Sequence, residues 1–140
     1  MPTLRALVES RIKDEVADFR EVGGAAGLGN ILAGRIAASG CYVYQEGSDA
    51  AANKMVNIVS QRETVQLAVV ITVKNVQDAR GGDADDVSQS LRDSVRAALL
   101  GWEPEGYEMI EKVGHKLISF ANGYLITKDV YRTAHQLRSI

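Results

Sequence analysis

The chain has 140 residues, 46% of them hydrophobic and 24% charged, which is typical of one globular domain. Sixteen basic and eighteen acidic residues give a formal net charge of −2, which argues against a protein that coats nucleic acid. A single cysteine, Cys41, excludes an internal disulfide and a thiolate zinc site and favours a reducing compartment. Because no segment resembles a secretory signal or a membrane span of about 18 apolar residues, we expect a soluble cytosolic protein.

The first part of the chain predicts two helices and a short strand. Apolar residues at spacings of three and four predict an amphipathic helix over residues 3–19, which should stop near Val22 because glycines follow. A shorter second helix is expected over residues 31–39. A brief β-rich run predicts a strand over residues 41–44, followed by a flexible loop of small and polar residues over 46–53.

The clearest alternation of apolar and polar residues lies between Arg62 and Val76 and predicts a half-buried strand. The extended character begins upstream at residues 55–59, so the β-rich region covers about twenty residues, against a usual five or six. At about 3.3 Å per residue, the fifteen residues from Arg62 already span roughly 50 Å. This length exceeds the width of the core of such a domain, so part of the strand should project beyond it.

The second half of the chain predicts a helix and a β-hairpin. After a loop over residues 77–82, Asp83 should cap a helix whose apolar stripe continues to Leu100. Strands near 115–120 and 124–135 should pair antiparallel, because an Asn-Gly pair between β-rich runs favours a tight hairpin turn. The order of elements therefore predicts one α+β domain with a mainly antiparallel β-sheet, a long central strand, a C-terminal hairpin and two main helices packed on one face.

No group of residues predicts catalysis or metal binding. The glycine-rich segment 23–29 follows a helix and lacks the spacing of a phosphate-binding fingerprint, so we interpret it as a turn. His115 and His135 lack neighbours at metal-ligand spacing, and the acidic run 83–86 lacks the spacing of a calcium loop. Cys41 has no basic neighbour and is expected to be a buried apolar thiol. We expect a protein without enzymatic activity, metal or cofactor.

Charge is distributed unevenly near the C-terminus. Residues 101–112 carry a net charge of −3 and residues 113–140 a net charge of +3. Two patches of opposite sign suit a surface that meets copies of itself head to tail, and they equally suit an ordinary solvated face.

Several segments resemble the tail terminator proteins of tailed bacteriophages and prophages. The resemblance includes the alternating stretch and its continuation, residues 61–82, and the following helix at Leu91-Arg92 and residues 97–102. It also includes the terminal hairpin, at residues 117–124, Asp129 and 131–133, and a segment near the N-terminus, residues 22–26.

The resemblance implies a structural protein that assembles as a ring, usually a hexamer, on the head-proximal end of the tail tube. There it would stop polymerisation of the tube protein and offer a docking surface to head-completion and neck proteins, by shape and charge and without covalent chemistry. It further implies a component of the virion tail, assembled in the cytoplasm of the bacterial host, with no membrane or sequence-specific nucleic-acid partner. The alternative function is a small-ligand or nucleotide-binding protein that uses the loop 23–29.

In such a ring, each subunit would contact its neighbour through the long strand and the loop of small residues. The residues predicted at the interface with other copies or with the tail are Lys54, Gln61, Arg62, Arg80 and Arg132. We expect charge reversal at Lys54 or Arg62 to weaken ring formation.

Overall fold

The structure, a computed structural model, describes residues 2–24, 29, 39–74, 82–121 and 123–139. Its elements in chain order are α1 (Leu4–Glu15), β1 (Glu21–Gly23), β2 (Ser39–Ala50), β3 (Ser60–Lys74), α3 (Gly82–Leu99), β4 (Glu111–Ala121) and β5 (Tyr124–Arg138). The strands form one sheet in the order β1-β2-β3-β5-β4. Strands β1 and β2 are parallel and all other neighbours antiparallel, which confirms the predicted α+β class.

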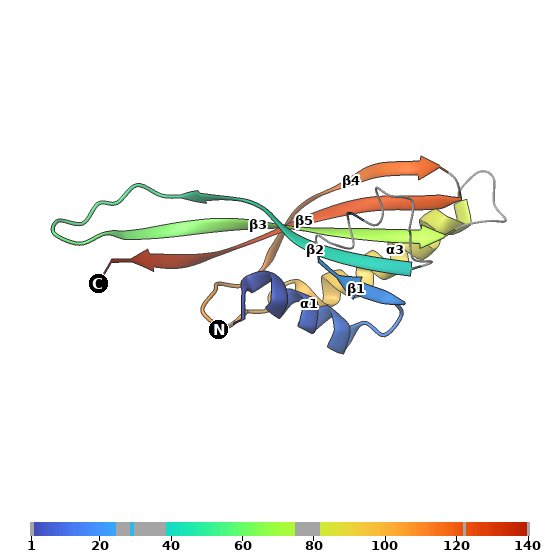
Figure 1. The fold of residues 1–140 in the computed structure, drawn as a ribbon, viewed down its shortest axis with the longest axis horizontal. Coiled ribbons are helices and arrows are strands. Elements are labelled where there is room, and N and C mark those ends of the chain that lie inside the picture. The colour runs from blue at the N-terminus through green and yellow to red at the C-terminus, as the bar shows by residue number, and fades with distance from the viewer. Residues whose placement is uncertain (1, 25–28, 30–38, 75–81, 122, 140) are drawn as a thin grey trace.

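The hydrophobic core lies between the helices and one face of the sheet. Figure 1 shows α1 and α3 on the same side of the strands, as predicted. The alternating residues Val65, Leu67, Val69, Ile71 and Val73 of β3 all belong to this core, together with buried residues of both helices. Burying side chains of this size stabilises the fold by about 1.5–3 kcal/mol each, which is why every second residue of this stretch is a large apolar one.

A second, smaller apolar cluster lies on the other face of the sheet. Tyr42, Val70 and Ile126 are buried there, and Tyr44 packs against them. The Tyr42 hydroxyl donates a hydrogen bond to the Glu21 carboxylate at 3.0 Å, which joins β2 to β1. Burial, with this hydrogen bond as the next cause, raises the pKa of Tyr42 to about 12. The body of the sheet is therefore buried on both faces, as the near-continuous apolar run in β3 requires.

Gly40 is the position where this packing tolerates no side chain. A Cβ atom at residue 40 would lie 2.7 Å from the Tyr42 hydroxyl and 2.8 Å from Thr72 Oγ1. We expect Gly40→Ala to lower the free energy of unfolding by about 1–3 kcal/mol, because two neighbours in the sheet must shift. Chemical denaturation measures this change. Gly47→Ala is the matched control, since a Cβ at that position meets no heavy atom within 4 Å; equal losses in both variants would contradict the explanation.

The first helix is shorter than the sequence predicts. It begins after Thr3, whose hydroxyl accepts a hydrogen bond from the Ala6 amide at 3.2 Å, and ends at Glu15 instead of residue 19. Val16 has an extended backbone but is still buried. Phe19 also packs against the core. The apolar pattern continues past the helix because the following segment faces the same core, so periodicity placed the helix end too late.

Strand β2 is longer than expected and continues through most of the predicted loop. Its second half, up to Ala50, pairs with β3 in the register Ser48↔Val65 and Ala50↔Glu63. The predicted extended segment 55–59 is instead a loop, and β3 begins at Ser60. The reason is that pairing to a neighbouring strand, and not the β-propensity of its own residues, holds the polar half of β2.

Three further differences concern the ends of elements. Strand β1 was not predicted, because three residues in a parallel pair give no periodic signal. Helix α3 begins at Gly82, one residue before the expected cap at Asp83. The predicted helix over 31–39 lies outside the described residues, except for Ser39, which begins β2.

The C-terminal hairpin is confirmed, with Gly123 at a positive φ of 79° in the connection between β4 and β5. Strand β4 forms one edge of the sheet and contains two irregularities, between Lys112 and Gly114 and between Leu117 and Ser119. Such bulges twist an edge strand and make it a poor template for further strands.

Three strands extend past the helices and form an arm. The arm comprises the distal parts of β2, β3 and β5 and the loop between β2 and β3, that is residues 45–66 and 132–139 (Figure 1). Within it β3 pairs with β2 on one side and with β5 on the other. The long strand therefore projects beyond the core, as its length predicts.

Candidate functional site

The loop at the end of the arm is organised by one side chain. The amide nitrogen of Asn53 donates to the carbonyl oxygens of Met55 and Ile58 at 3.2 and 3.1 Å. Its amide oxygen accepts from the backbone nitrogens of Met55 and Ser60 at 3.2 and 2.9 Å. Ser139 adds two hydrogen bonds to the Val59 backbone, at 2.8 and 2.9 Å. The loop is thus held in a defined shape although it lies far from the core.

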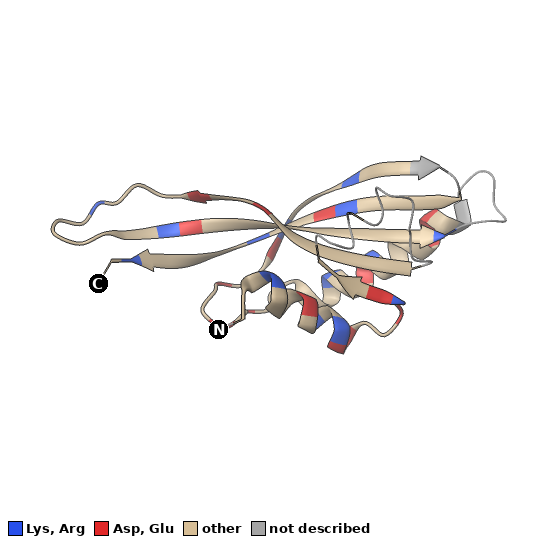
Figure 2. Cartoon of the chain, in the orientation of Figure 1, with Lys and Arg blue, Asp and Glu red and all other residues tan. Residues whose placement is uncertain are grey.

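This ordered loop presents apolar side chains to solvent. Met55 is 53% exposed, Val56 82%, Ile58 46% and Val59 41%. We call residues 53–59 the tip. Lys54 is the only charged residue between Asp49 and Arg62, and Figure 2 shows few charged positions on this part of the arm. An exposed apolar patch with one cation marks a surface for contact with another protein.

Ion pairs and a ring contact fasten the arm to the segment between α3 and β4 and to the first residue of β4. Arg62 of β3 holds Glu108 with two hydrogen bonds of 2.8 Å, and Arg132 of β5 pairs with Glu111. Tyr107 stacks on the His135 ring at 4.6 Å between centroids. These contacts fix the direction in which the arm leaves the body.

His135 also makes a hydrogen bond of 2.6 Å with the Glu63 carboxylate on the neighbouring strand. This bond, with a weaker one from Ser48, holds the pKa of Glu63 below its ordinary value of 4.5. Because the pKa in the folded state is the lower one, the pair stabilises the arm above about pH 4.5 and loses this effect as the pH falls through the folded pKa.

We expect an NMR titration to give Glu63 a midpoint below 4.5, and His135→Phe to raise it towards 4.5 while keeping the ring against Tyr107. Ser48→Ala serves as control and should raise the midpoint less, because its hydrogen bond contributes less than that of His135. A wild-type midpoint at or above 4.5 would show that the pair does not form in solution.

A groove lies at the base of the arm. We define the basal groove as two adjoining hollows of about 750 and 410 Å³ between residues 100–111 and strands β3 and β5; they share Glu108 and Ala134. Leu100 and Met109 line the larger hollow and are 51% and 60% exposed. The smaller hollow has an acidic rim that includes Glu103 and Glu105.

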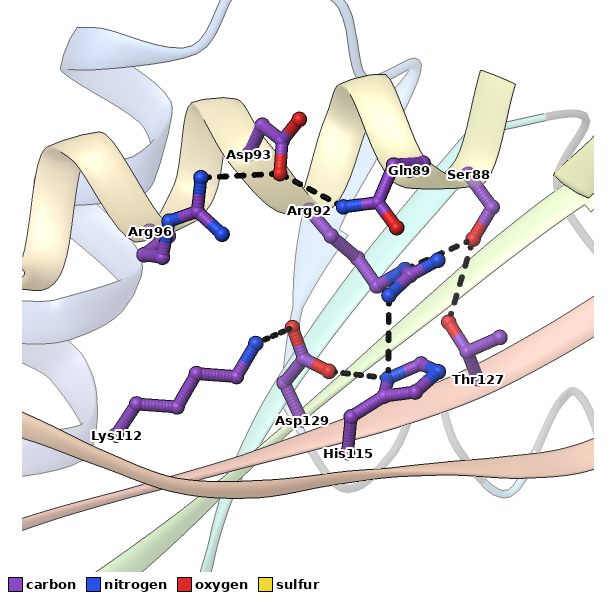
Figure 3. A network of polar contacts seen from close by, with 9 residues as sticks. All are labelled: Ser88, Gln89, Arg92, Asp93, Arg96, Lys112, His115, Thr127 and Asp129. Atoms are coloured by element: carbon purple, nitrogen blue, oxygen red, sulfur yellow. Dashed lines mark hydrogen bonds and ion pairs between the residues drawn. The ribbon is translucent and has the colours of Figure 1, made fainter. Parts of the chain in front are cut away.

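A polar network is buried between α3 and the hairpin (Figure 3). The Asp129 carboxylate on β5 is 1% exposed and lies 2.5 Å from His115 Nδ1 and 3.5 Å from Lys112 Nζ, both on β4. The Arg92 guanidinium of α3 lies 3.5 Å from the same His115 nitrogen and 3.4 Å from Ser88 Oγ. The network therefore ties the helix to the two C-terminal strands.

The geometry of this network does not match that of a serine nucleophile with a histidine base. Ser88 contacts Arg92 and Thr127, and the contacts of His115 are with Asp129 and Arg92. A nucleophile needs a base within hydrogen-bond reach, and a triad also needs an open site. Ser88 is fully buried, so the network supports packing of α3. Among the described residues no group of three or more potential metal ligands was found.

The sequence-predicted interface residues lie in different surroundings. Lys54 lies exposed at the tip, and Gln61 donates a hydrogen bond of 2.9 Å to the Ala51 carbonyl inside the arm. Arg62 and Arg132 are exposed, but each pairs with a glutamate of its own chain. Arg80 lies outside the described residues, as do residues 25–28 and 30 around the glycine-rich loop.

The structure also shows the surroundings of the charged C-terminal segments and of Cys41. The oppositely charged patches partly neutralise each other within the chain, because Glu111 of the acidic segment pairs with Arg132 of the basic one. Cys41 is fully buried as expected, and burial raises the pKa of its thiol. In the described part of the chain, no helix has the length and apolar character needed to cross a membrane.

Three features of the site were not predicted from the sequence: Asn53, the exposed apolar residues of the tip, and Glu108. The run from Met55 to Val59 was interpreted as the start of a strand, although its place directly after a small polar segment is equally consistent with a loop. Glu108 is 46 residues from Arg62, and no local pattern predicts that pair.

The sequence of this chain was compared with known proteins and protein families. A search of curated proteins finds no significant match. Residues 3–140 match the protein family described as phage tail terminator protein, which covers the sheet, both described helices, the arm and the groove. The match supports the resemblance noted in the long strand and the terminal hairpin. The chain belongs to the phage tail terminator family.

Proposed function

We propose that this chain forms a ring, most simply a hexamer, that caps the head-proximal end of the tail tube, stops polymerisation of the tube protein and presents a surface to head-completion and neck proteins. Membership of the family establishes a structural role in phage tail assembly and a place in the virion tail. Ring formation, capping of the tube and the surface for neck proteins are part of the proposal, as is assembly in the cytoplasm of the bacterial host before the tail joins the head.

The observation that carries the proposal is the arm. It is three strands wide and ends in an ordered apolar tip. The tip lies at the far end of the arm (Figure 1), whereas the groove lies at its base. A molecule with two different contact surfaces associates head to tail, and such contacts close into a ring when the rotation between copies permits. A closed ring is suited to capping a tube, because it leaves no free contact surface around its circumference.

Polymerisation of the cognate tail tube protein tests the proposal. The purified chain, added to growing tubes, is expected to shorten the tubes in a dose-dependent manner and to appear at one end only in negative-stain electron microscopy. The shortening follows because a capped end accepts no further subunits. Tubes of unchanged length, or protein bound along the tube wall, would contradict the proposed function.

A further inference from the structure

We propose that the tip of one copy docks into the basal groove of a second copy of this chain. This inference rests on the proposed function, because it specifies the contact that joins neighbours in the ring. It is carried by the shape and apolar character of the tip, by the opposite charge of the groove and by the separation of the two surfaces within one molecule.

The tip is shaped in advance for docking. Four hydrogen bonds of the Asn53 side chain fix the loop, so little conformational freedom is lost when it meets a partner. Val56 at 82% exposure and Met55 at 53% are the most exposed apolar side chains of the loop. Leaving such side chains in water is unfavourable, and a partner that covers them gains the free energy of their burial.

The groove offers matching apolar surface and opposite charge. Leu100 and Met109, more than half exposed, supply apolar contacts beside a hollow of about 750 Å³. Glu103 and Glu105 on the adjoining rim form no ion pair with the described residues, whereas Glu108 is already neutralised by Arg62. The single cation of the tip, Lys54, therefore complements these two carboxylates at the groove.

A tip cannot dock into the groove of its own chain. The strands β2, β3 and β5 hold it at the far end of the arm, away from the segment between α3 and β4 (Figure 1). The contact is therefore between copies and involves two different surfaces, and such contacts form a ring when the rotation between copies closes.

The other exposed apolar surface is less suited to this role. Val113, Leu117 and Ile118 are about half exposed on the edge strand β4. Two bulges interrupt this strand, and Lys116 lies on it as an exposed charge. These are features with which proteins prevent pairing at a sheet edge.

Two matched variants test the inference. Val56→Asp places a charge on the tip, and Val113→Asp places the same charge on the exposed part of β4. Copies of the full-length chain bound per tube end are counted, and mass in solution is followed over a concentration series. We expect Val56→Asp to weaken ring assembly at least tenfold and Val113→Asp to change it less than twofold. Unaltered assembly of Val56→Asp, or loss confined to Val113→Asp, would overturn the inference.

A charge exchange tests the partner surface. Lys54→Glu and Glu105→Lys are each expected to weaken assembly several-fold, and the double variant to recover most of the loss, because the exchange restores opposite charges across the contact. Two single losses that add up without recovery would show that Lys54 and Glu105 do not meet.

A photoreactive benzoylphenylalanine at position 56, used on tail tubes carrying the assembled protein, identifies the occupied surface. We expect crosslinks to residues 100–111 of a second copy. Crosslinks to the tube protein or to another part of the chain, from rings that still cap tubes, would overturn the inference and leave the proposed function standing. Failure of the wild-type chain to reach tube ends would refute both.

Discussion

Asp129→Asn is expected to lower the free energy of unfolding by about 3–5 kcal/mol, because removing one member of a buried charged network leaves the others uncompensated. Asp129 is the buried carboxylate in Figure 3, and Arg92 is only 8% exposed. The carboxylate pairs with the Lys112 ammonium and hydrogen-bonds His115, which in turn contacts the Arg92 guanidinium, so its loss leaves these cationic side chains without their shared anion. Urea denaturation followed by circular dichroism measures the change.

Asp93→Asn is the matched control for this prediction. Asp93 lies on the same helix as Arg92 and pairs with Arg96 at 3.2 Å, but both side chains are nearly half exposed. A solvent-exposed ion pair contributes about 1 kcal/mol or less, so this variant should be nearly as stable as the wild type. If the two variants lose equal stability, the network contributes no more than a surface pair does.

Shortening the arm is expected to abolish capping while leaving the body folded. An Asn-Gly turn in place of residues 49–64 would join Ser48 to Val65, which face each other in the register of β2 and β3. The buried residues of β3 from Val65 onwards remain, so the core between the sheet and the helices is retained. The variant lacks the tip and also the ion pair between Arg62 and Glu108 at the base of the arm. Tail tubes grown with this variant should be as long as tubes grown without any terminator.

Thermal unfolding shows whether the shortened chain is folded, since a cooperative transition requires the core. Asn53→Ala is the companion variant, because it keeps the arm but removes the four hydrogen bonds that order the tip. It should cap tubes less well than the wild type and better than the shortened chain. A folded, shortened chain that caps tubes as the wild type does would show that the arm has no part in assembly.

The sequence predicts the elements whose pattern is set by burial. The residues from Val65 to Val73 in β3 alternate because one face packs on the helices, and the stripe of Leu91, Val95 and Leu99 in α3 faces the same core. The turn at Gly123 is predicted because its backbone needs a positive φ. In these places local pattern and tertiary packing agree.

The sequence could not predict the polar half of β2 or the end of α1. Residues 46–50 have no strand pattern of their own and are held by their partners on β3. Val16 and Phe19 continue the apolar spacing of α1 although the helix has ended, because they pack on the core from a non-helical segment. Both errors arise where contacts distant in sequence override local preference.

The candidate surface was predicted only in part. The predicted interface residues include Lys54, which lies at the tip, and also Arg62 and Arg132, whose charges pair with Glu108 and Glu111 within the same chain. Such pairs depend on how the strands and the segment after α3 meet, which a single sequence does not reveal. The exposure of the apolar side chains of the tip could not be predicted for the same reason, since only the fold shows that these side chains face solvent.

The central claim is that copies of this chain form a closed ring at one end of the tail tube, and electron microscopy of tail tubes carrying the gold-labelled protein tests it most directly. The account predicts label at a single end of each tube and class averages of that end with closed rotational symmetry, with the arm of each copy reaching the base of its neighbour. Label distributed along the tubes, or single copies at the end without contact to one another, would contradict it.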